Sequence, residues 1–164
     1  KKINLPSKKI NYFIPFFFII LIFFQIMLGA FVSGMDAGKL YNSWPLMNSS
    51  YFPNDNSFNN LFKFSAFSDP SLVQFMHRNL AYIIFIFYFF IFIKIYKNNL
   101  SKYFILINVL GILLVIQILL GIFTLLLDAQ IVISSMHQIC SIFLVSASVY
   151  FFYINTIGHS NLKN

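Results

Sequence analysis

Residues 12–32 read YFIPFFFIILIFFQIMLGAFV, an apolar run without a charged side chain. About 20 residues of helix span the hydrocarbon core of a bilayer, so this run has the length and composition of a transmembrane helix. Three further runs share both properties, over residues 72–93, 103–127 and 131–154. The sequence therefore predicts an all-α membrane protein, a bundle of four transmembrane helices that forms a single domain over residues 1–164.

The composition of the chain favours the same class. Of its 164 residues, 59% are hydrophobic, 9% are charged and 23 are Phe, and the mean hydropathy is +0.80. A soluble domain of this length could not bury so much apolar surface. A net charge of +7 would indicate nucleic acid in a soluble protein, but here most basic residues flank the apolar runs. We therefore expect the lipid bilayer as a partner, and no nucleic acid.

Lysines and aspartates predict how the four runs are oriented. Basic residues gather before the first run, between the second and third, and in the tail, at Lys1, Lys2, Lys8, Lys9, Lys94, Lys97, Lys102 and Lys163. The other connections, residues 33–70 and 128–130, carry all 4 carboxylates of the chain and only two lysines, Lys39 and Lys63. The positive-inside rule places both termini on the cytoplasmic or matrix side. We expect a multi-pass protein of a bacterial or mitochondrial inner membrane.

The long outer connection, residues 33–70, is rich in aromatic side chains. This composition favours a loop that lies on the membrane surface rather than in water. Within the loop, the spacing of Phe58, Leu61, Phe62 and Phe67 predicts one face of a short interfacial helix.

Part of the sequence repeats. Residues 25–29 and 117–121 share a Gln and a Gly, and an Asp-Ala pair follows each of them at the same spacing, at 36–37 and 128–129. A Met-His pair then occurs in the second run and again in the fourth, ending at His77 and His137. The pattern predicts a pseudo-repeat in which helices 1–2 resemble helices 3–4, and repeats in membrane proteins commonly place a site at their interface.

His77 and His137 are the candidate functional residues, because an ionisable side chain inside a membrane helix is costly and needs a reason. Asp69-Pro70 is a good helix start, so His77 is expected about two turns into its helix. The fourth helix is expected to start near Gln130, which places His137 about two turns in as well. The two imidazoles are therefore predicted at one depth, in the outer leaflet.

Such a pair suits haem iron, which accepts two axial imidazoles from opposite faces. A bare zinc or copper ion would require a third or fourth ligand, and the sequence offers none at that depth. No Cys-x-x-Cys-His motif is present, so any haem is non-covalent. The structural alternative is that both histidines bond to helix backbones or to Gln25 and Gln117.

Other residues along the helices have two interpretations each. Arg78 could reach a haem propionate or a lipid phosphate. Small residues could admit a flat cofactor or let the helices pack closely; these are Gly29, Ser33, Gly111, Gly121, Ser134, Ser141 and Ser148. We expect Cys140, inside an apolar run, to be a packing residue, and His159, in the polar tail, to be solvated.

Four motifs resemble the haem A synthase family. Residues 34–47, GMDAGKLYNSWPLM, are similar to that family's GLDAG…YNTFPLM loop, and residues 73–78, VQFMHR, to the start of a helix in its second half. Residues 117–124, QILLGIFT, and 135–138, SMHQ, resemble its last two helices. The resemblance extends over nearly the whole chain.

Members of that family have eight transmembrane helices in two related halves, and they oxidise a methyl group of haem O to the formyl group of haem A for cytochrome oxidase. The resemblance implies that this chain is the C-terminal half and that His77 and His137 hold its b-type haem cofactor as axial iron ligands. The N-terminal half, which binds the substrate haem, has a Glu three residues before its first ligand histidine, where this chain has Gln74. The implied partners are that half, haem O and haem O synthase.

Three functions follow from this reading. The first is a haem-dependent oxidoreductase, with this half as its electron-transfer module and inactive alone. The second is a stand-alone membrane b-type cytochrome or haem carrier without catalysis. The third is a haem-free membrane assembly factor.

Overall fold

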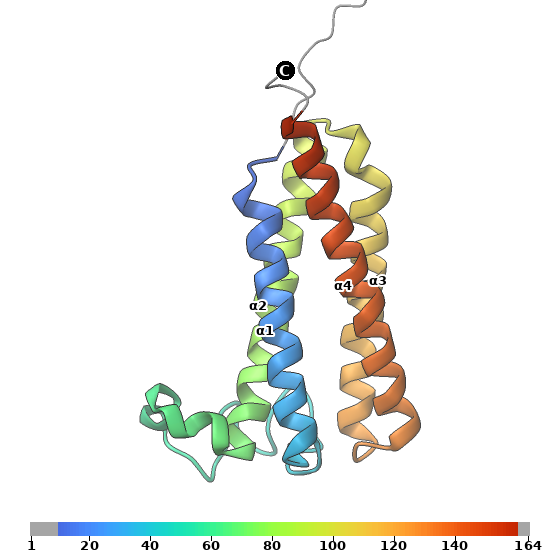
Figure 1. The fold of residues 1–164 in the computed structure, drawn as a ribbon. Helices are drawn as coiled ribbons and strands as arrows, with labels where there is room; N and C mark the ends of the chain where they lie inside the picture. Colours follow the sequence, from blue (N-terminus) through green and yellow to red (C-terminus); the bar gives the residue numbers. More distant parts are fainter. Residues whose placement is uncertain (1–9, 161–164) are drawn as a thin grey trace, which may run out of the picture.

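The computed structural model describes residues 10–160. Within this range the chain forms four long helices, α1 (Phe13–Gly34), α2 (Pro70–Lys97), α3 (Phe104–Leu126) and α4 (Ile131–Ser160). Each is long and apolar enough to cross a membrane, and together they form an elongated bundle (Figure 1). The predicted all-α fold class is confirmed. Lys1, Lys2, Lys8, Lys9, Lys163 and the side chain of His159 lie outside the described part.

Four short 3₁₀ helices connect the long ones: η1 (Ala37–Lys39), η2 (Phe58–Phe62), η3 (Phe64–Ser68) and η4 (Ser101–Tyr103). Three of them lie in the connection between α1 and α2. We call the end of the bundle with this connection and the α3–α4 turn the loop end, and the end with η4 the opposite end.

Two helices, α2 and α4, are longer than the apolar runs predicted for them, residues 72–93 and 131–154. α2 begins at Pro70 because the Asp69 carboxylate accepts a hydrogen bond from the Leu72 N–H at 3.1 Å and Pro occupies the first turn. It continues to Lys97 because lysine tolerates helix well and its charge complements the helix C-terminus. The apolar run thus marks where lipid is expected, whereas caps and charges determine where the helix ends.

The main buried apolar cluster of the described residues lies toward the opposite end. This cluster takes residues from the first half of α1 and α3, from the second half of α2, and from Leu144 onwards in α4. There Tyr103 donates to Asn155 Oδ1 at 2.7 Å, and Asn155 donates to the Ile10 carbonyl at 3.2 Å, all within fully buried surroundings. Toward the loop end, the α1–α2 pair and the α3–α4 pair separate (Figure 1).

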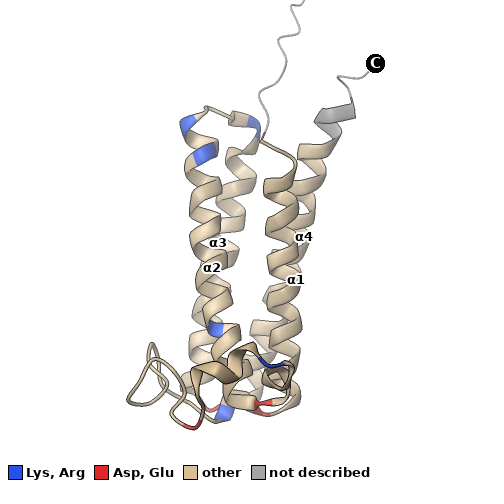
Figure 2. Cartoon of the chain, turned by 90° about the vertical axis from the view of Figure 1, so that its left-hand side faces the viewer, with Lys and Arg blue, Asp and Glu red and all other residues tan. Residues whose placement is uncertain are grey.

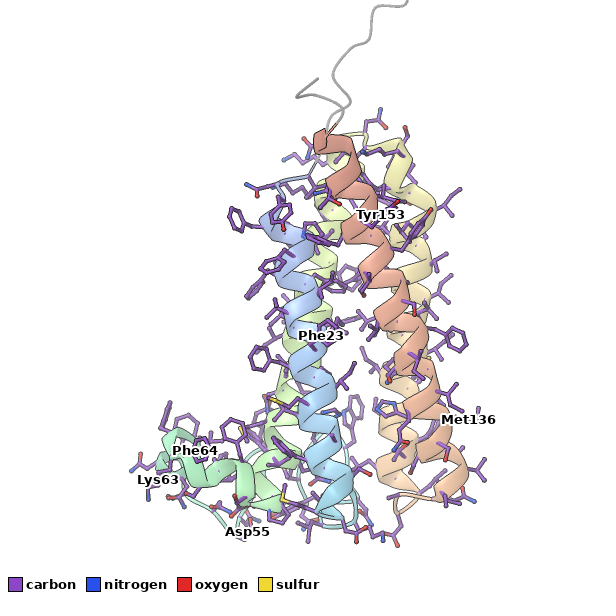
Figure 3. All side chains as sticks on the ribbon, in the orientation of Figure 1. Phe23, Asp55, Lys63, Phe64, Met136 and Tyr153 are labelled. Carbon is purple, nitrogen blue, oxygen red and sulfur yellow. The ribbon has the colours of Figure 1, made fainter. Side chains whose placement is uncertain are left out.

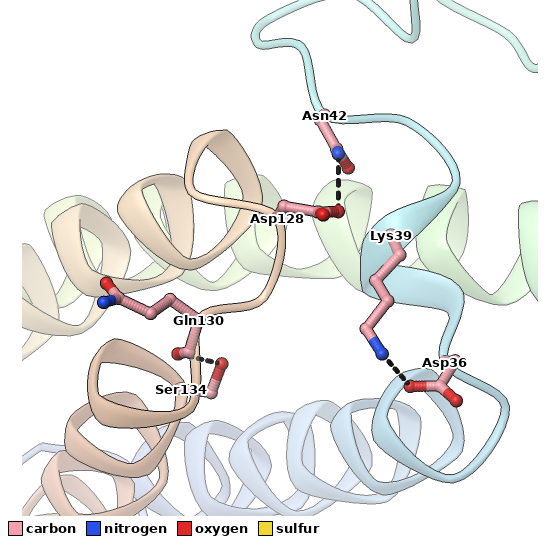
Figure 4. A network of polar contacts seen from close by, with 6 residues as sticks. All are labelled: Asp36, Lys39, Asn42, Asp128, Gln130 and Ser134. Carbon is pink, nitrogen blue, oxygen red and sulfur yellow. Dashed lines mark hydrogen bonds and ion pairs between the residues drawn. The ribbon is translucent and has the colours of Figure 1, made fainter.

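The two helix pairs end alike at the loop end. α1 and α3 are each followed by an aspartate in the left-handed backbone conformation, Asp36 with φ 51° and Asp128 with φ 54°. Asp36 pairs with Lys39 at 3.0 Å, and Asp128 accepts a hydrogen bond from Asn42 at 2.9 Å (Figure 4). The Asn42–Asp128 contact links the α1–α2 connection to the turn of the other pair. The repeat found in the sequence is therefore also a repeat of local structure.

The predicted interfacial helix has a different form. Instead of one helix with a single apolar face, η2 and η3 are two 3₁₀ turns separated by Lys63 in an extended conformation. They form an arm that projects sideways from the loop end, with Phe64 near its tip (Figures 1 and 3). Phe62 and Phe64 are 80% and 90% exposed. One α-helix does not form because Asn60 and Lys63 close short i+3 turns there.

Charge is divided between the two ends of the bundle (Figure 2). Within the described residues, the loop end carries Asp36, Asp55, Asp69 and Asp128 together with Lys39, Lys63 and Arg78. The opposite end carries three lysines, Lys94, Lys97 and Lys102, and no described carboxylate.

Candidate functional site

His77 lies in the second turn of α2, about 10 Å along the axis from the helix start. Its ring Nε2 is 3.2 Å from the amide nitrogen of Gln25 on α1. The same amide nitrogen donates to the backbone carbonyl of His77 at 3.1 Å. One glutamine side chain thus contacts both the ring and the backbone of the histidine.

His137 repeats this arrangement on the other helix pair. It lies in the second turn of α4, and its ring Nε2 is 3.5 Å from the amide nitrogen of Gln117 on α3. That nitrogen donates to the His137 carbonyl at 3.0 Å. The contacts with Gln25 and Gln117 are those of the structural alternative stated above, and they leave the other ring nitrogen of each histidine unused.

A glycine lies against each imidazole. A Cβ atom on Gly29 would be 3.1 Å from His77 Cε1, and one on Gly121 would be 3.0 Å from His137 Cε1. Each glycine follows its glutamine by one helical turn, so the two share a helix face. The repeated Gln and Gly of the sequence therefore form, with the histidine, a repeated three-residue arrangement.

Gly111 serves packing. A Cβ on Gly111 would be 2.1 Å from the Tyr88 hydroxyl, so this glycine lets α2 approach α3. The hydroxyls of Ser134, Ser141 and Ser148 donate to carbonyls of their own helix.

Four polar atoms around the histidines are buried without a hydrogen-bond partner among the described residues: Nδ1 of His77 and His137, and Oε1 of Gln25 and Gln117. An unpaired buried polar group costs about 1–3 kcal/mol, and native proteins pair nearly all of them. The described residues contain no group of three or more His, Cys, Asp or Glu that could hold a metal ion. The donor set therefore fits a metal that arrives with its own equatorial ligands and needs two imidazoles, as haem iron does.

Arg78 holds the connection between α1 and α2, residues 35–69. Its guanidinium donates to the carbonyls of Tyr41 at 2.7 Å, Ser43 at 2.9 Å and Leu46 at 3.4 Å. Its Nε is buried without a partner among the described residues. A contact with a haem propionate stays a prediction, while the anchoring of the loop is a function that sequence reasoning missed.

Further contacts attach the same loop to α2. The Trp44 indole donates to the Tyr82 hydroxyl at 3.0 Å, and the Tyr51 hydroxyl donates to Asn79. Tyr41 donates to Asp55 at 2.8 Å, and burial together with this bond raises the pKa of Tyr41. The concentration of aromatic and amide residues in the loop was the only sequence signal for these contacts.

Gln74 hydrogen-bonds to the connection between α1 and α2. Its side chain is 2% exposed, and its amide nitrogen donates to the Tyr41 carbonyl at 3.3 Å. Its Oε1 is buried without a partner among the described residues.

Four membrane-length helices, arranged as two alike pairs that each carry a half-buried histidine, define an integral membrane protein. Residues 3–149 match the COX15-CtaA family, described as cytochrome oxidase assembly protein. The chain belongs to this haem A synthase family, as the sequence motifs predicted, and is a multi-pass membrane protein of it.

The relatives named "Heme A synthase" are about twice as long. The chain is 40% identical to the protein of Pelagibacter ubique over 94% of the chain and 46% of the relative. For Rickettsia bellii the identity is 39%, over 89% and 44%, and for Rickettsia prowazekii 34%, over 92% and 45%. The chain spans less than half the length of these relatives. No solved structure matches it.

Proposed function

We propose that the chain is the haem-binding C-terminal half of a haem A synthase, in which His77 and His137 are the axial ligands of one b-type haem. The observation that carries this proposal is the repeated arrangement of Gln, His and Gly on the two helix pairs, with an unpaired buried Nδ1 on each ring. Two equivalent imidazoles, one from each pair, match the two-sided ligation of haem iron.

A bound haem would supply one-electron redox chemistry. In this proposal the chain contributes the two imidazoles, the glycine surfaces that leave room for them, and an apolar bundle that excludes water. Occupation of both axial positions favours electron transfer over binding of oxygen or substrate.

The oxidation of the haem O methyl group is proposed for the complete two-half protein. All four carboxylates, Asp36, Asp55, Asp69 and Asp128, lie outside the long helices. Gln74 carries an amide, which does not exchange a proton near neutral pH. The proposed partners are therefore the N-terminal half, the substrate haem O, and a haem O synthase that supplies it.

Orientation in the membrane is part of the proposal. The lysines of the opposite end and the aspartates of the loop end favour a cytoplasmic or matrix location for the opposite end and both termini. The membrane is then a bacterial inner membrane or a mitochondrial inner membrane, with the histidines in its outer leaflet.

Optical spectra of the purified chain test the ligation. The wild type should show a low-spin, six-coordinate b-type spectrum in its reduced-minus-oxidised difference. His77→Ala and His137→Ala should each convert the haem to high spin or lose it, because each removes an axial ligand. The matched control is His159→Ala, which removes the remaining histidine and should leave the spectrum unchanged. Retention of the low-spin spectrum by both of the first two variants would exclude this pair as the ligand set.

A membrane b-type cytochrome or haem carrier without catalysis is the second candidate. It is favoured by the absence of a carboxylate from the described parts of the four long helices. Both candidates predict the same optical spectrum. They are distinguished by co-expression with a matching N-terminal half, which should produce haem A only if the first candidate is correct.

A further inference from the structure

The arm formed by η2 and η3, residues 58–68, presents three exposed aromatic side chains. Phe58, Phe62 and Phe64 are 60%, 80% and 90% exposed. The rings of Phe58 and Phe62 lie 5.7 Å apart and form an edge-to-face pair. Neighbouring apolar side chains that remain exposed in a folded chain mark a surface that contacts lipid or another protein.

Phe67 connects this surface to the membrane-facing side of α1. Its ring centroid lies 6.1 Å from that of Phe64 on the arm and 6.3 Å from that of Phe31 on α1. Phe31 is 38% exposed and lies in the last turn of α1, a helix long and apolar enough to cross the bilayer. That turn marks the level at which the chain leaves the hydrocarbon core. The arm starts at this level and extends the apolar surface of α1 sideways (Figure 1).

The side chains of the arm and its surroundings are sorted by polarity along the bundle axis. In Figure 3, Phe64 lies on the side of the arm nearer the middle of the bundle, whereas Asp55 lies at the far side of the same connection. Residues 57–68 contain one charged side chain, Lys63, and no carboxylate. Aromatic rings toward the hydrocarbon and a cation beside the phosphates form the arrangement that a membrane surface favours.

Hydrogen bonds fasten the arm to the first turn of α2. The Asn60 amide donates to Asn56 at 3.1 Å, and the Asn56 amide donates to Asp69 at 3.0 Å and to Ser71 at 2.8 Å. Asp69 is the residue that caps α2. The position of the arm and the start of α2 are therefore coupled.

We propose that the arm is a membrane-surface anchor, which inserts Phe58, Phe62 and Phe64 at the boundary between lipid headgroups and acyl chains and places Lys63 beside the lipid phosphates. The partner is lipid because the apolar surface of the arm is continuous with the membrane-spanning surface of α1, and because its one charge is opposite to that of phosphate. The anchor holds the first turn of α2 at this level. It requires no haem, so the inference is independent of the proposed function.

Tryptophan fluorescence of the full chain in phosphatidylcholine vesicles tests the anchor. Trp44→Phe removes the single native tryptophan, and Phe62→Trp or Phe64→Trp then places an indole on the arm. Both indoles should be quenched more strongly by lipid brominated near the ester end of the acyl chain than by lipid brominated near the terminal methyl. Both should be protected from acrylamide in water.

The matched control places the indole elsewhere on the same connection. Asn54→Trp in the Trp44→Phe background replaces an exposed residue beside Asp55. Its indole should be quenched by acrylamide and little by either brominated lipid. Circular dichroism of every variant checks that the helices are retained.

Lys63→Glu in the Phe64→Trp chain tests the contact with phosphate. Anionic headgroups repel a carboxylate, so quenching by lipid brominated near the ester end should decrease in vesicles that contain phosphatidylglycerol. Lys63→Gln should give an intermediate decrease, and the differences should be smaller in phosphatidylcholine alone. Equal quenching of all three chains in the phosphatidylglycerol vesicles would overturn the role of Lys63.

The outcomes that overturn the anchor are distinct from one another. Acrylamide quenching of both arm indoles to the extent seen in the control would place the arm in water. Protection from acrylamide and from both lipids would show that protein covers the surface, such as a second copy of the chain. Co-reconstitution with a matching N-terminal half should leave the lipid quenching unchanged, and its loss would assign the surface to that half instead of lipid.

Discussion

At the scale of single residues, the effect of replacing a glycine in this bundle depends on the atoms that lie near the position of the added Cβ. Gly29 and Gly121 meet imidazole rings, Gly111 meets the Tyr88 ring, and Gly34 has no atom within 4 Å of where its Cβ would be. These contacts give the same residue type three different consequences when it is replaced.

Gly111→Ala should destabilise the protein by about 1–3 kcal/mol. The new methyl would be 2.1 Å from the hydroxyl of Tyr88, which is buried and donates to the Ile107 carbonyl at 3.1 Å. The ring cannot move away without giving up that hydrogen bond. Thermal unfolding in detergent measures the effect, with Gly34→Ala as a control that should be neutral. Equal melting temperatures for the two variants would contradict this account.

Residue roles could be predicted from the sequence only where a residue's own chemistry restricts it. A histidine in an apolar run is recognisable as a candidate functional residue, and Gln25 and Gln117 could be named as possible partners of the two histidines. That one amide nitrogen contacts both the ring and the backbone of each histidine could not be predicted, because this depends on the distance between neighbouring helices. The anchoring of the loop by Arg78 could not be predicted either, because its partners are backbone carbonyls, which have no sequence signature.

At the scale of elements, the start of α2 combines several hydrogen bonds on one carboxylate. Asp69 accepts from the Leu72 N–H, from the Ser71 hydroxyl and from the Asn56 amide. Burial alone would raise the pKa of Asp69, but these bonds outweigh it and lower the pKa below its ordinary value of 3.8. The cap fixes the first residue of α2, and His77 therefore lies in the second turn of that helix.

The stabilisation from Asp69 should depend on pH. Its folded-state pKa is the lower one, so its contribution is complete above the pKa of the unfolded chain and is lost as the pH falls through the folded-state pKa. We expect Asp69→Asn, which still caps the helix but does not titrate, to lose less stability than the wild type between about pH 5 and pH 2. Thermal unfolding followed by circular dichroism at several pH values measures this difference.

Asp69→Ala completes the comparison. It removes the cap at every pH and should cost about 1 kcal/mol at neutral pH. Identical pH profiles for the wild type and Asp69→Asn would show that this carboxylate does not carry the acid sensitivity.

Elements were predictable to the extent that they depend on local sequence. Hydropathy predicts the four helices, and Asp69-Pro70 predicts the first residue of α2. The arm of η2 and η3 was predicted as one helix, which was wrong because Lys63 adopts an extended conformation between two 3₁₀ turns. Such short segments follow from turn geometry and tertiary contacts more than from apolar spacing.

At the scale of the whole molecule, the division of charge predicts the orientation in the membrane. Cysteines introduced in an otherwise Cys-free variant (Cys140→Ser) should report it. Asn59→Cys lies in the exposed part of the loop end, and Ser101→Cys is exposed at the opposite end. An impermeant thiol reagent added from the outer side should label the first and not the second. The reverse pattern would invert the proposed topology.

Residues 1–164 alone should not convert haem O to haem A. The helices contain no described carboxylate to assist proton movement, and two axial histidines would leave the iron without an open position. Haem extraction and chromatography from cells that supply haem O but lack their own synthase give the measurement. Co-expression with a matching N-terminal half should restore haem A, whereas haem A formed by this chain alone would contradict the half-enzyme proposal.

The buried cluster of the opposite end has a consequence for how the site is assembled. It joins all four helices on the side away from the histidines, so the positions of α2 and α4 are determined by apolar packing that requires no cofactor. The entropy of bringing two distant histidines together is then lost during folding rather than on binding. If the proposed haem binds, we therefore expect the haem-free chain to be preorganised for it, with the buried cluster of the opposite end contributing to its affinity through the positions of α2 and α4.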